Sequence, residues 1–383
     1  MEKENLIYLD HNATTPIDPG AASLMTHIMK EEYGNPSSGY LLGRRVKEAL
    51  EVHRDVVAGL MGAKGREILF TSGGSESNNM VLKGIIDFRD PRSSHIITSA
   101  VEHPAVINTV LYLMELGVEV TILPVDHHGR VDPDDVKAAI TPRTSLISIM
   151  SANNETGTLQ PIEEISAAAR ARGVPFHTDA AQALGKIPVD VQALGVDFLT
   201  LAGHKLYAPK GVGALYVREG LELTPLIHGG GQEGGRRAGT ENTILCMGLG
   251  AASEVAGKRL PRDFQDMQAM RDRLQEILFN ALDGIVLNGH PTERLPNTLN
   301  ISIPHLEGSA ILDGLPRIMA STGAACHDRS VKLSHVLSAM GVPPEVGMGA
   351  LRFSVGRSNT MDQIEEAGAL IADQVNTMRG KSS

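Results

Sequence analysis

Two short stretches decide the predicted fold of this chain: Val174-Pro175-Phe176-His177-Thr178-Asp179-Ala180-Ala181-Gln182 and Phe198-Leu199-Thr200-Leu201-Ala202-Gly203-His204-Lys205. Each begins with an apolar run typical of a buried strand, and a charged side chain follows that run, Asp179 in the first stretch and Lys205 in the second. Similar runs lie on both sides of this pair, at residues 68–70, 95–98, 118–123, 146–150 and 213–217. Helical patterns separate most of them, so we predict a mostly parallel sheet with helices on both faces.

Polar residues follow several of these predicted strands. They are residues 72–76, Asn153 and Asn154, Asp179, and Lys205. Sheets of this kind bind ligands beyond the carboxyl ends of their strands. We therefore expect these residues to converge on one crevice.

The pairing of Lys205 with Asp179 predicts a pyridoxal-phosphate pocket. A lysine can hold the cofactor's aldehyde as an imine, and an aspartate can keep a pyridine nitrogen protonated so that the ring accepts electrons. Residues 71–77 (TSGGSES) join a strand to a helix, where glycines, hydroxyls and unpaired amides could cradle a phosphate. A plain strand-to-helix turn with a serine cap explains that segment equally well when it is taken alone.

Cys326 ends a run of small residues that begins at Ser321, and residues 327–334 have no helix or strand periodicity. A loop of this composition would leave the thiol accessible, and a nearby imidazole or cation would favour the reactive thiolate. Cys246 lies in an apolar helical stretch and is expected to be inert core. His103 follows a predicted strand, where it could stack on a cofactor and shuttle protons. Alone, it is better explained as a helix-capping residue.

The composition is that of a globular protein. The chain has 383 residues, 42% of them hydrophobic and 21% charged, with a formal net charge of −10. The acidic balance and the lack of a basic stripe exclude a nucleic-acid partner held by phosphate contacts. We found neither an apolar run long enough for a membrane span nor a signal peptide, so a cytoplasmic protein is expected. The two cysteines form no disulfide framework and no metal motif.

The last third predicts a smaller α/β domain. A long helical pattern runs from Asn242 to about Leu282, with a predicted break near Pro261. Strands are expected at 296–303 and 352–355, followed by a last helix over 361–378. We predict a large domain over residues 14–255 and a small domain formed by residues 1–13 and 256–383, which carries the Cys326 loop.

The residues resemble the cysteine desulfurases, which are class V members of the fold-type-I pyridoxal-phosphate enzymes, and also the related selenocysteine lyases. The likeness runs from residues 8–16 (YLDHNATTP) to residues 352–357 (RFSVGR). Between them come, in order, residues 34–38 (GNPSS), 152–157 (ANNETG), 203–205 (GHK) and 237–240 (RAGT). The resemblance implies a large domain with a mostly parallel seven-stranded sheet and a smaller C-terminal α/β domain.

The resemblance also implies a role for each site residue. Lys205 would hold the cofactor covalently, Asp179 would face the pyridine nitrogen, Gln182 would touch the phenolate oxygen, and His103 would stack on the ring. The remaining contacts would come from Gly74, Ser75 and His204 at the phosphate, Asn154 against the ring, Asn35 and Arg352 at the substrate carboxylate, and Thr240 from the other subunit of a homodimer.

The implied activity is conversion of L-cysteine to L-alanine, with the sulfur held by Cys326 as a persulfide and passed to an acceptor protein. Two alternatives remain open from the sequence. One is a selenocysteine lyase acting on L-selenocysteine. The other is a class V aminotransferase-like enzyme that does not need Cys326. No metal is implied.

Overall fold

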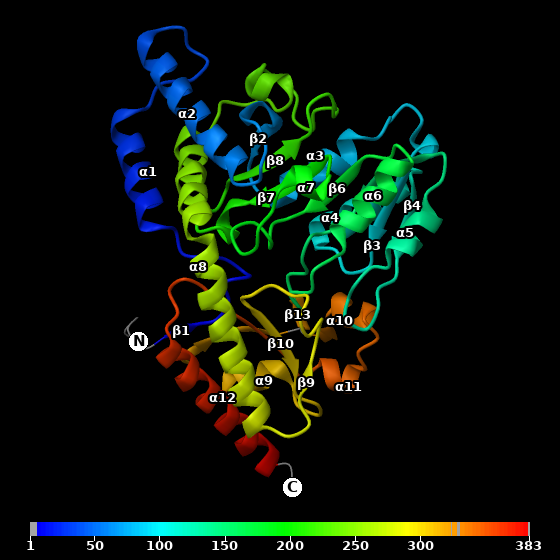
Figure 1. Ribbon diagram of the computed structural model, residues 1–383, viewed down its shortest axis with the longest axis vertical. Coiled ribbons are helices and arrows are strands. Elements are labelled where there is room, and N and C mark those ends of the chain that lie inside the picture. Colours follow the sequence, from blue (N-terminus) through cyan, green and yellow to red (C-terminus); the bar gives the residue numbers. More distant parts are fainter. Residues whose placement is uncertain (1–5, 323, 328–329, 382–383) are drawn as a thin grey trace.

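The computed structural model describes residues 6–322, 324–327 and 330–381, and for residues 324–327, 330–332 and 381 only the backbone. The chain forms two layered units joined by one long helix (Figure 1). The larger unit is built around a seven-stranded sheet and the smaller around a four-stranded sheet.

The large sheet has the strand order β2-β8-β7-β6-β5-β3-β4. Every strand is parallel to the others except β8, which is antiparallel to both of its neighbours. The predicted seven strands and the mostly parallel sheet are confirmed. The strands are β2 (Ile68–Thr71), β3 (His95–Ser99), β4 (Glu119–Leu123), β5 (Thr144–Ser148), β6 (Phe176–Asp179), β7 (Phe198–Ala202) and β8 (Gly213–Val217).

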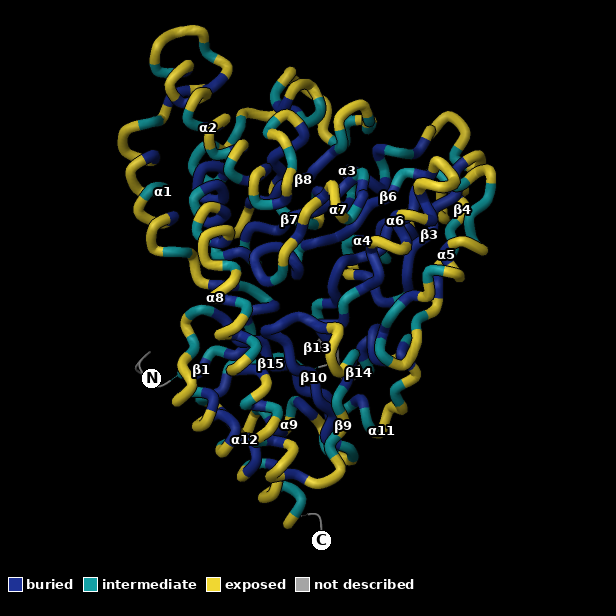
Figure 2. The backbone as a smooth tube through the Cα atoms, viewed as in Figure 1, coloured by how far each residue is buried: buried dark blue, intermediate teal, exposed yellow. Residues whose placement is uncertain are grey.

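Helices cover both faces of this sheet because the strands are apolar on both sides. Phe176 and Leu199 belong to one hydrophobic core, and Leu69 and Phe198 belong to a second core on the opposite face. Figure 2 shows the buried strands inside a shell of helices whose outer faces are exposed. The covering helices are α1 (Pro19–Glu31), α2 (Leu41–Gly59), α3 (Gly74–Gly84), α4 (Pro104–Glu115), α5 (Pro133–Ala139), α6 (Ile162–Ala171) and α7 (Val191–Leu194).

The long helix α8 (Thr243–Ala281) connects the two units without interruption (Figure 1). The predicted break near Pro261 is therefore wrong. A proline removes one backbone hydrogen bond and crowds the preceding turn. Pro261 lies on the exposed face of α8, where water can satisfy the carbonyl that loses its partner, and buried residues on both sides hold the helix in place.

The small unit combines the chain's two ends. Its main sheet has the order β12-β15-β10-β9, and β1 from the N-terminal segment pairs in parallel with β11. The strands are β1 (Ile7–Tyr8), β9 (Val286–Leu287), β10 (Thr298–Ser302), β11 (Ile318–Met319), β12 (Ser321–Thr322) and β15 (Ala350–Ser354). The helices are α9 (Gly308–Asp313), α10 (His335–Ala339), α11 (Pro344–Gly347) and α12 (Met361–Lys381).

The segment that carries Cys326 differs from its predicted form. It contains an antiparallel pair of strands, β13 (Ala324–His327) and β14 (Ser330–Leu333), in which Cys326 lies opposite Val331. The expected absence of a strand is therefore wrong. Four-residue strands that pair only with each other leave too short an alternation to be recognised in the sequence.

The two halves of α8 pack in different hydrophobic cores. Met247, Leu249 and Ala252 pack in the core of the large unit, whereas Met267 and Leu274 pack with Ile7 and Leu9 in the core of the small unit. This division supports the two domains predicted above, whose exact limits stay a prediction. Within the described residues, no helix is both long and apolar enough to cross a membrane.

Candidate functional site

A cavity of about 230 Å³ lies where the carboxyl ends of the large sheet's parallel strands face the small unit. The lining residues come from the loops after β2, β3, β5, β6 and β7, from the N-terminal segment, and from β15. The expected convergence is found for residues 74–75, Asn154, Asp179 and Lys205, whereas Asn153 does not line the cavity. Nine of the predicted site residues line this cavity: Gly74, Ser75, His103, Asn154, Asp179, Gln182, His204, Lys205 and Arg352.

Lys205 ends a short 3-10 turn directly after β7. Its Nζ donates hydrogen bonds to the backbone carbonyls of Asn12, at 2.5 Å, and Ala13, at 2.7 Å. Burial, followed by the positive charge of Arg352, lowers the pKa of Lys205 to about 8. A substantial fraction of the amine is therefore neutral near physiological pH, which is the form that attacks a carbonyl.

Asp179 is the last residue of β6 and is 6% exposed. Its Oδ2 accepts a 2.7 Å hydrogen bond from the Nδ2 of Asn78, and its Oδ1 accepts one of 2.9 Å from the backbone N–H of Ala181. Both bonds fix the carboxylate in one orientation at the cavity wall. A buried carboxylate held in this way can keep a ring nitrogen protonated.

The start of α3 also contributes to the cavity wall. Gly73, which caps this helix, has a φ of +149°, a conformation that favours glycine. The first N–H groups of a helix have no acceptor inside the helix, and here they belong to Gly74 and Ser75 at the cavity. A side chain on Gly74 would place its Cβ 3.3 Å from the Cβ of Ala202. The arrangement suits an anion such as phosphate.

His204 lies beside this cradle. Its Nδ1 is 3.2 Å from the hydroxyl of Thr14. Burial, followed by the positive charge of Lys205, lowers the pKa of His204 to about 4. The imidazole is therefore neutral at physiological pH.

His103 caps a helix, as one of the two sequence interpretations expected, and its side chain also lines the cavity. It caps α4, because its Nδ1 accepts a 3.1 Å hydrogen bond from the backbone N–H of Ala105, and it also lines the cavity. Desolvation lowers the pKa of His103, although Asp179 opposes this effect. Since Nδ1 accepts a hydrogen bond, the neutral ring carries its proton on Nε2.

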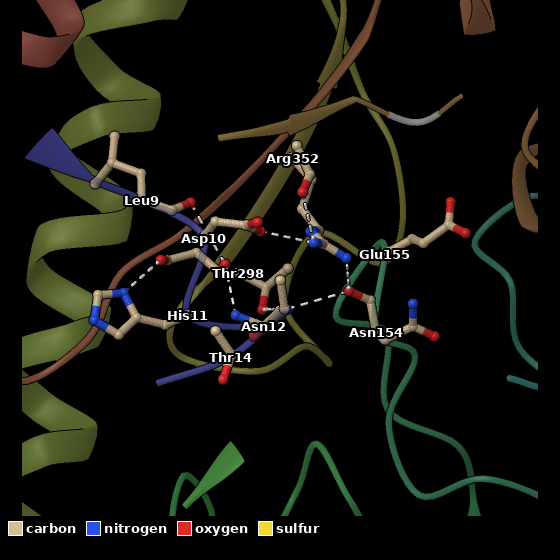
Figure 3. A network of polar contacts seen from close by, with 12 residues as sticks. Leu9, Asp10, His11, Asn12, Thr14, Asn154, Glu155, Thr298 and Arg352 are labelled. Carbon is tan, nitrogen blue, oxygen red and sulfur yellow. Dashed lines mark hydrogen bonds and ion pairs between the residues drawn. The ribbon is translucent and has the colours of Figure 1, made fainter. Parts of the chain in front are cut away.

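Arg352 enters the cavity from β15 in the small unit. Its Nη1 donates to the carbonyl of Asn154 at 3.0 Å, and its Nη2 donates to Asp10 Oδ1 at 2.7 Å and to Ser321 Oγ at 2.9 Å. Figure 3 shows Asp10 and Asn154 on either side of the guanidinium. Its Nε is buried and has no hydrogen-bond partner within the described part of the chain.

Three predicted residues lie elsewhere. Asn35 and Thr240 are exposed and do not line the cavity of a single chain, and Thr240 was expected to act on a second subunit. Cys326 lies on β13, and its side chain is outside the described residues. Cys246 is buried in the large core, where burial raises the pKa of its thiol to about 12, as expected for an inert residue.

Sequence reasoning missed a polar cluster behind Gln182. The Nζ of Lys186 donates to Gln182 Oε1 at 2.6 Å and to Asn12 Oδ1 at 3.2 Å, and Gln182 Nε2 donates to the carbonyl of Asn12 at 3.0 Å. Burial, and then the charges of Lys205 and Arg352, lower the pKa of Lys186 well below its ordinary value. The sequence holds no local signal for this cluster, because residues 181–187 are not helical and Asn12 lies 170 positions before Gln182.

Known proteins are similar to this chain over nearly its whole length. The model of the family "Aminotransferase class-V" matches residues 7–366. A cysteine desulfurase IscS from Methanosarcina thermophila is 46% identical over 378 residues, which covers 98% of this chain and 93% of the relative. A cysteine desulfurase IscS from Dictyoglomus turgidum is also 46% identical, over 95% of this chain and 92% of the relative.

Solved structures are similar over the same length. A NifS-like protein superposes with a TM-score of 0.91 at 36% identity, covering 97% of this chain and all of that one. A structure described as SspA in complex with cysteine gives a TM-score of 0.81 at 36% identity, with coverage of 92% and 99%.

The fold and the pocket define an enzyme of the pyridoxal-phosphate-dependent class to which these proteins belong. This chain belongs to the class-V aminotransferase family and, within it, to the group of the cysteine desulfurases.

The pocket fits the cofactor on which this family depends. The N-terminal N–H groups of α3, a buried carboxylate at Asp179 and a lysine of lowered pKa line one cavity. These groups match the phosphate, the pyridine nitrogen and the aldehyde of pyridoxal phosphate. Among the residues that the structure describes, no three metal-ligating side chains gather at one place.

Proposed function

We propose that this protein is a cysteine desulfurase that converts L-cysteine to L-alanine and transfers the sulfur to Cys326 as a persulfide. One observation carries the proposal: Lys205, Asp179 and Arg352, from three separate segments, line a single cavity. The high identity to cysteine desulfurases over nearly the whole chain gives the substrate class.

Pyridoxal phosphate would be held by Lys205, Asp179, Gln182, His103, Asn154 and the phosphate cradle at Gly74, Ser75 and His204. When bound, it supplies an electron sink for the pair that remains on Cα after a proton leaves. Lys205 is the base placed to take that proton, because its neutral form is abundant near pH 8. Arg352, with Asn35, would orient the substrate by its carboxylate.

His103 would hold a proton at the substrate sulfur through Nε2, since its Nδ1 is occupied by the helix cap. In the transfer step, the Cys326 thiolate donates an electron pair to that sulfur. A sulfur–sulfur bond forms, the Cβ–S bond breaks, and its electron pair and a proton complete the methyl group of alanine. Cysteine and one enzyme thiol give alanine and one enzyme persulfide, so the step needs no outside oxidant or reductant.

We further propose a homodimer in which Thr240 reaches the cofactor phosphate of the other subunit, because Thr240 is exposed in a single chain. An acceptor protein would then take the sulfur from Cys326. A cytoplasmic location stays a prediction from the sequence. Sedimentation of the purified protein tests the dimer, and cell fractionation tests the location.

Two variants test the chemistry. Lys205→Ala should lose both the visible absorbance of the cofactor imine and all alanine production. Cys326→Ala should keep the absorbance but lose the persulfide. If Cys326→Ala released sulfide from L-cysteine at the wild-type rate, the acceptor role of Cys326 would be wrong.

The same assay with L-selenocysteine separates the nearest alternative. A dedicated selenocysteine lyase would turn over only the selenium substrate. A keto-acid product in place of alanine would indicate an aminotransferase-like enzyme.

A further inference from the structure

The second strand of the cysteine-bearing hairpin is fastened to the cavity wall. Strand β14 ends at Leu333, and the next residue, Ser334, is 5% exposed. Its hydroxyl donates a 2.5 Å hydrogen bond to the Oε2 of Glu155. Glu155 directly follows Asn154, which lines the cavity.

Glu155 is itself held in place. Its N–H donates to Asn153 Oδ1 at 2.9 Å, and its carbonyl accepts a 3.1 Å hydrogen bond from Asn300 Nδ2. Figure 3 shows its carboxylate turned away from Arg352, so the side chain does not point to the substrate-binding guanidinium. Burial raises the pKa of Glu155, and this rise is opposed by Ser334 and by the charges of His335 and Arg352. Whether protonated or ionised, the side chain presents an oxygen that can accept from Ser334.

Two more hydrogen bonds attach the ends of the hairpin to the pocket. The residue after Ser334 is His335, whose Nε2 lies 2.9 Å from the carbonyl of Glu102, the neighbour of His103. At the other end, Ser321 accepts the 2.9 Å hydrogen bond from Arg352 described above and precedes β13 closely in the chain. Each attachment therefore reaches a cavity-lining residue or its immediate neighbour.

We propose that Glu155 is a positioning residue for Cys326. Through its hydrogen bond to Ser334, Glu155 holds the end of strand β14 against the cavity wall. This contact sets how often the thiol reaches the substrate sulfur. This inference rests on the proposed function only where it concerns sulfur transfer. The anchoring of the hairpin itself is a property of the fold. The role depends on an acceptor oxygen at the correct distance, and it does not depend on negative charge.

Three substitutions of Glu155 distinguish a need for an acceptor oxygen at the correct distance from a need for negative charge. Glu155→Gln keeps the length and an acceptor oxygen but removes the charge. Glu155→Asp keeps the charge but withdraws the oxygen by one methylene group, and Glu155→Ala removes the acceptor. We expect the Asp and Ala variants to lose the anchor and the Gln variant to behave like the wild type.

The first readout is amide hydrogen exchange of the strand residues in β13 and β14, measured on the holoenzyme without substrate. The Asp and Ala variants should exchange about tenfold faster there, the factor that corresponds to about 1.4 kcal/mol for one hydrogen bond. The second readout is single-turnover persulfide formation on Cys326. It should slow by a similar factor, with unchanged cofactor absorbance and an unchanged KM for L-cysteine.

Unchanged exchange in β13 and β14 of Glu155→Ala would overturn the proposal, and so would a Gln variant as impaired as the Ala variant. If the Ala variant does not fold, the Asp variant decides, because it keeps the charge but withdraws the acceptor from Ser334. If wild-type Cys326 never carries sulfur, the proposed function fails, and hydrogen exchange still decides whether Glu155 anchors the hairpin.

Discussion

The carboxamide of Asn78 on α3 donates a 2.7 Å hydrogen bond to the carboxylate of Asp179 at the end of β6. This contact joins the helix that we propose to hold the cofactor phosphate to the residue that we propose to face the pyridine nitrogen. One residue thus links two parts of the cofactor site that are far apart in the sequence.

We expect Asn78→Ala to weaken cofactor binding by roughly tenfold or more, because a hydrogen bond to a charged group contributes about 1.5–3 kcal/mol. Titration of the apoenzyme with pyridoxal phosphate measures the change. Asn288→Ala is the matched control, since Asn288 is an equally buried amide in the small unit. Wild-type affinity in Asn78→Ala would contradict the prediction.

Lys186 and Gln182 offer a test by paired substitution. Lys186→Met leaves the buried Oε1 of Gln182 without its donor and should lower the free energy of unfolding by about 1–3 kcal/mol. Replacing both partners, as in Lys186→Met with Gln182→Leu, should cost less than the sum of the single changes. Urea unfolding of the apoenzyme measures the free energy of unfolding of each single variant and of the double variant. Strict additivity of the losses would show that the two side chains are not coupled.

The lowered pKa of Lys205 predicts a pH dependence of its reactivity. The neutral amine fraction should rise as pH increases through about 8 and then level off. Reductive methylation of the apoenzyme, followed by mass spectrometry of the Lys205 peptide, measures this profile. A short lysine peptide should keep rising towards a midpoint of about 10.4. The same high midpoint at Lys205 would show that the pocket does not lower its pKa.

Because His177 is buried in the large sheet, we expect the protein to lose stability at acidic pH. It is buried on β6 between Ser148 and Thr200, and burial lowers its pKa to about 4. The unfolded chain has a higher histidine pKa, about 6.5, so it binds more protons between these values. The stabilising contribution of neutral His177 is complete above about pH 6.5 and is lost as pH falls towards 4.

The size of this effect is about 3 kcal/mol, from a pKa difference of roughly two and a half units. Urea unfolding at several pH values should give a shallower acid loss for His177→Asn than for the wild type. Parallel stability curves for the two proteins would mean that His177 does not titrate in this window.

Much of the fold could be predicted from the sequence because its strands are local apolar runs. The seven runs became the seven strands of the large sheet, and several of the polar residues after them line one cavity. The resemblance then supplied the individual roles, such as Gln182 against the phenolate oxygen. Those roles stay predictions, although nine of the residues line the cavity.

The failures share a physical cause, which is that contacts between distant segments decide the outcome. Helix α8 continues through Pro261 because two separate cores hold its halves, and local propensity contains no information about them. The hairpin at Cys326 forms from two strands too short to show a period. Glu155 and Ser334 are 179 positions apart, so their contact has no local signal.

Mass spectrometry of the Cys326 peptide after one turnover with L-cysteine tests the central claim most directly. The account predicts one added sulfur on Cys326, an equal amount of L-alanine, and no sulfur on the buried Cys246. Alanine formed while Cys326 stays unmodified, or sulfur found on Cys246 instead, would contradict it.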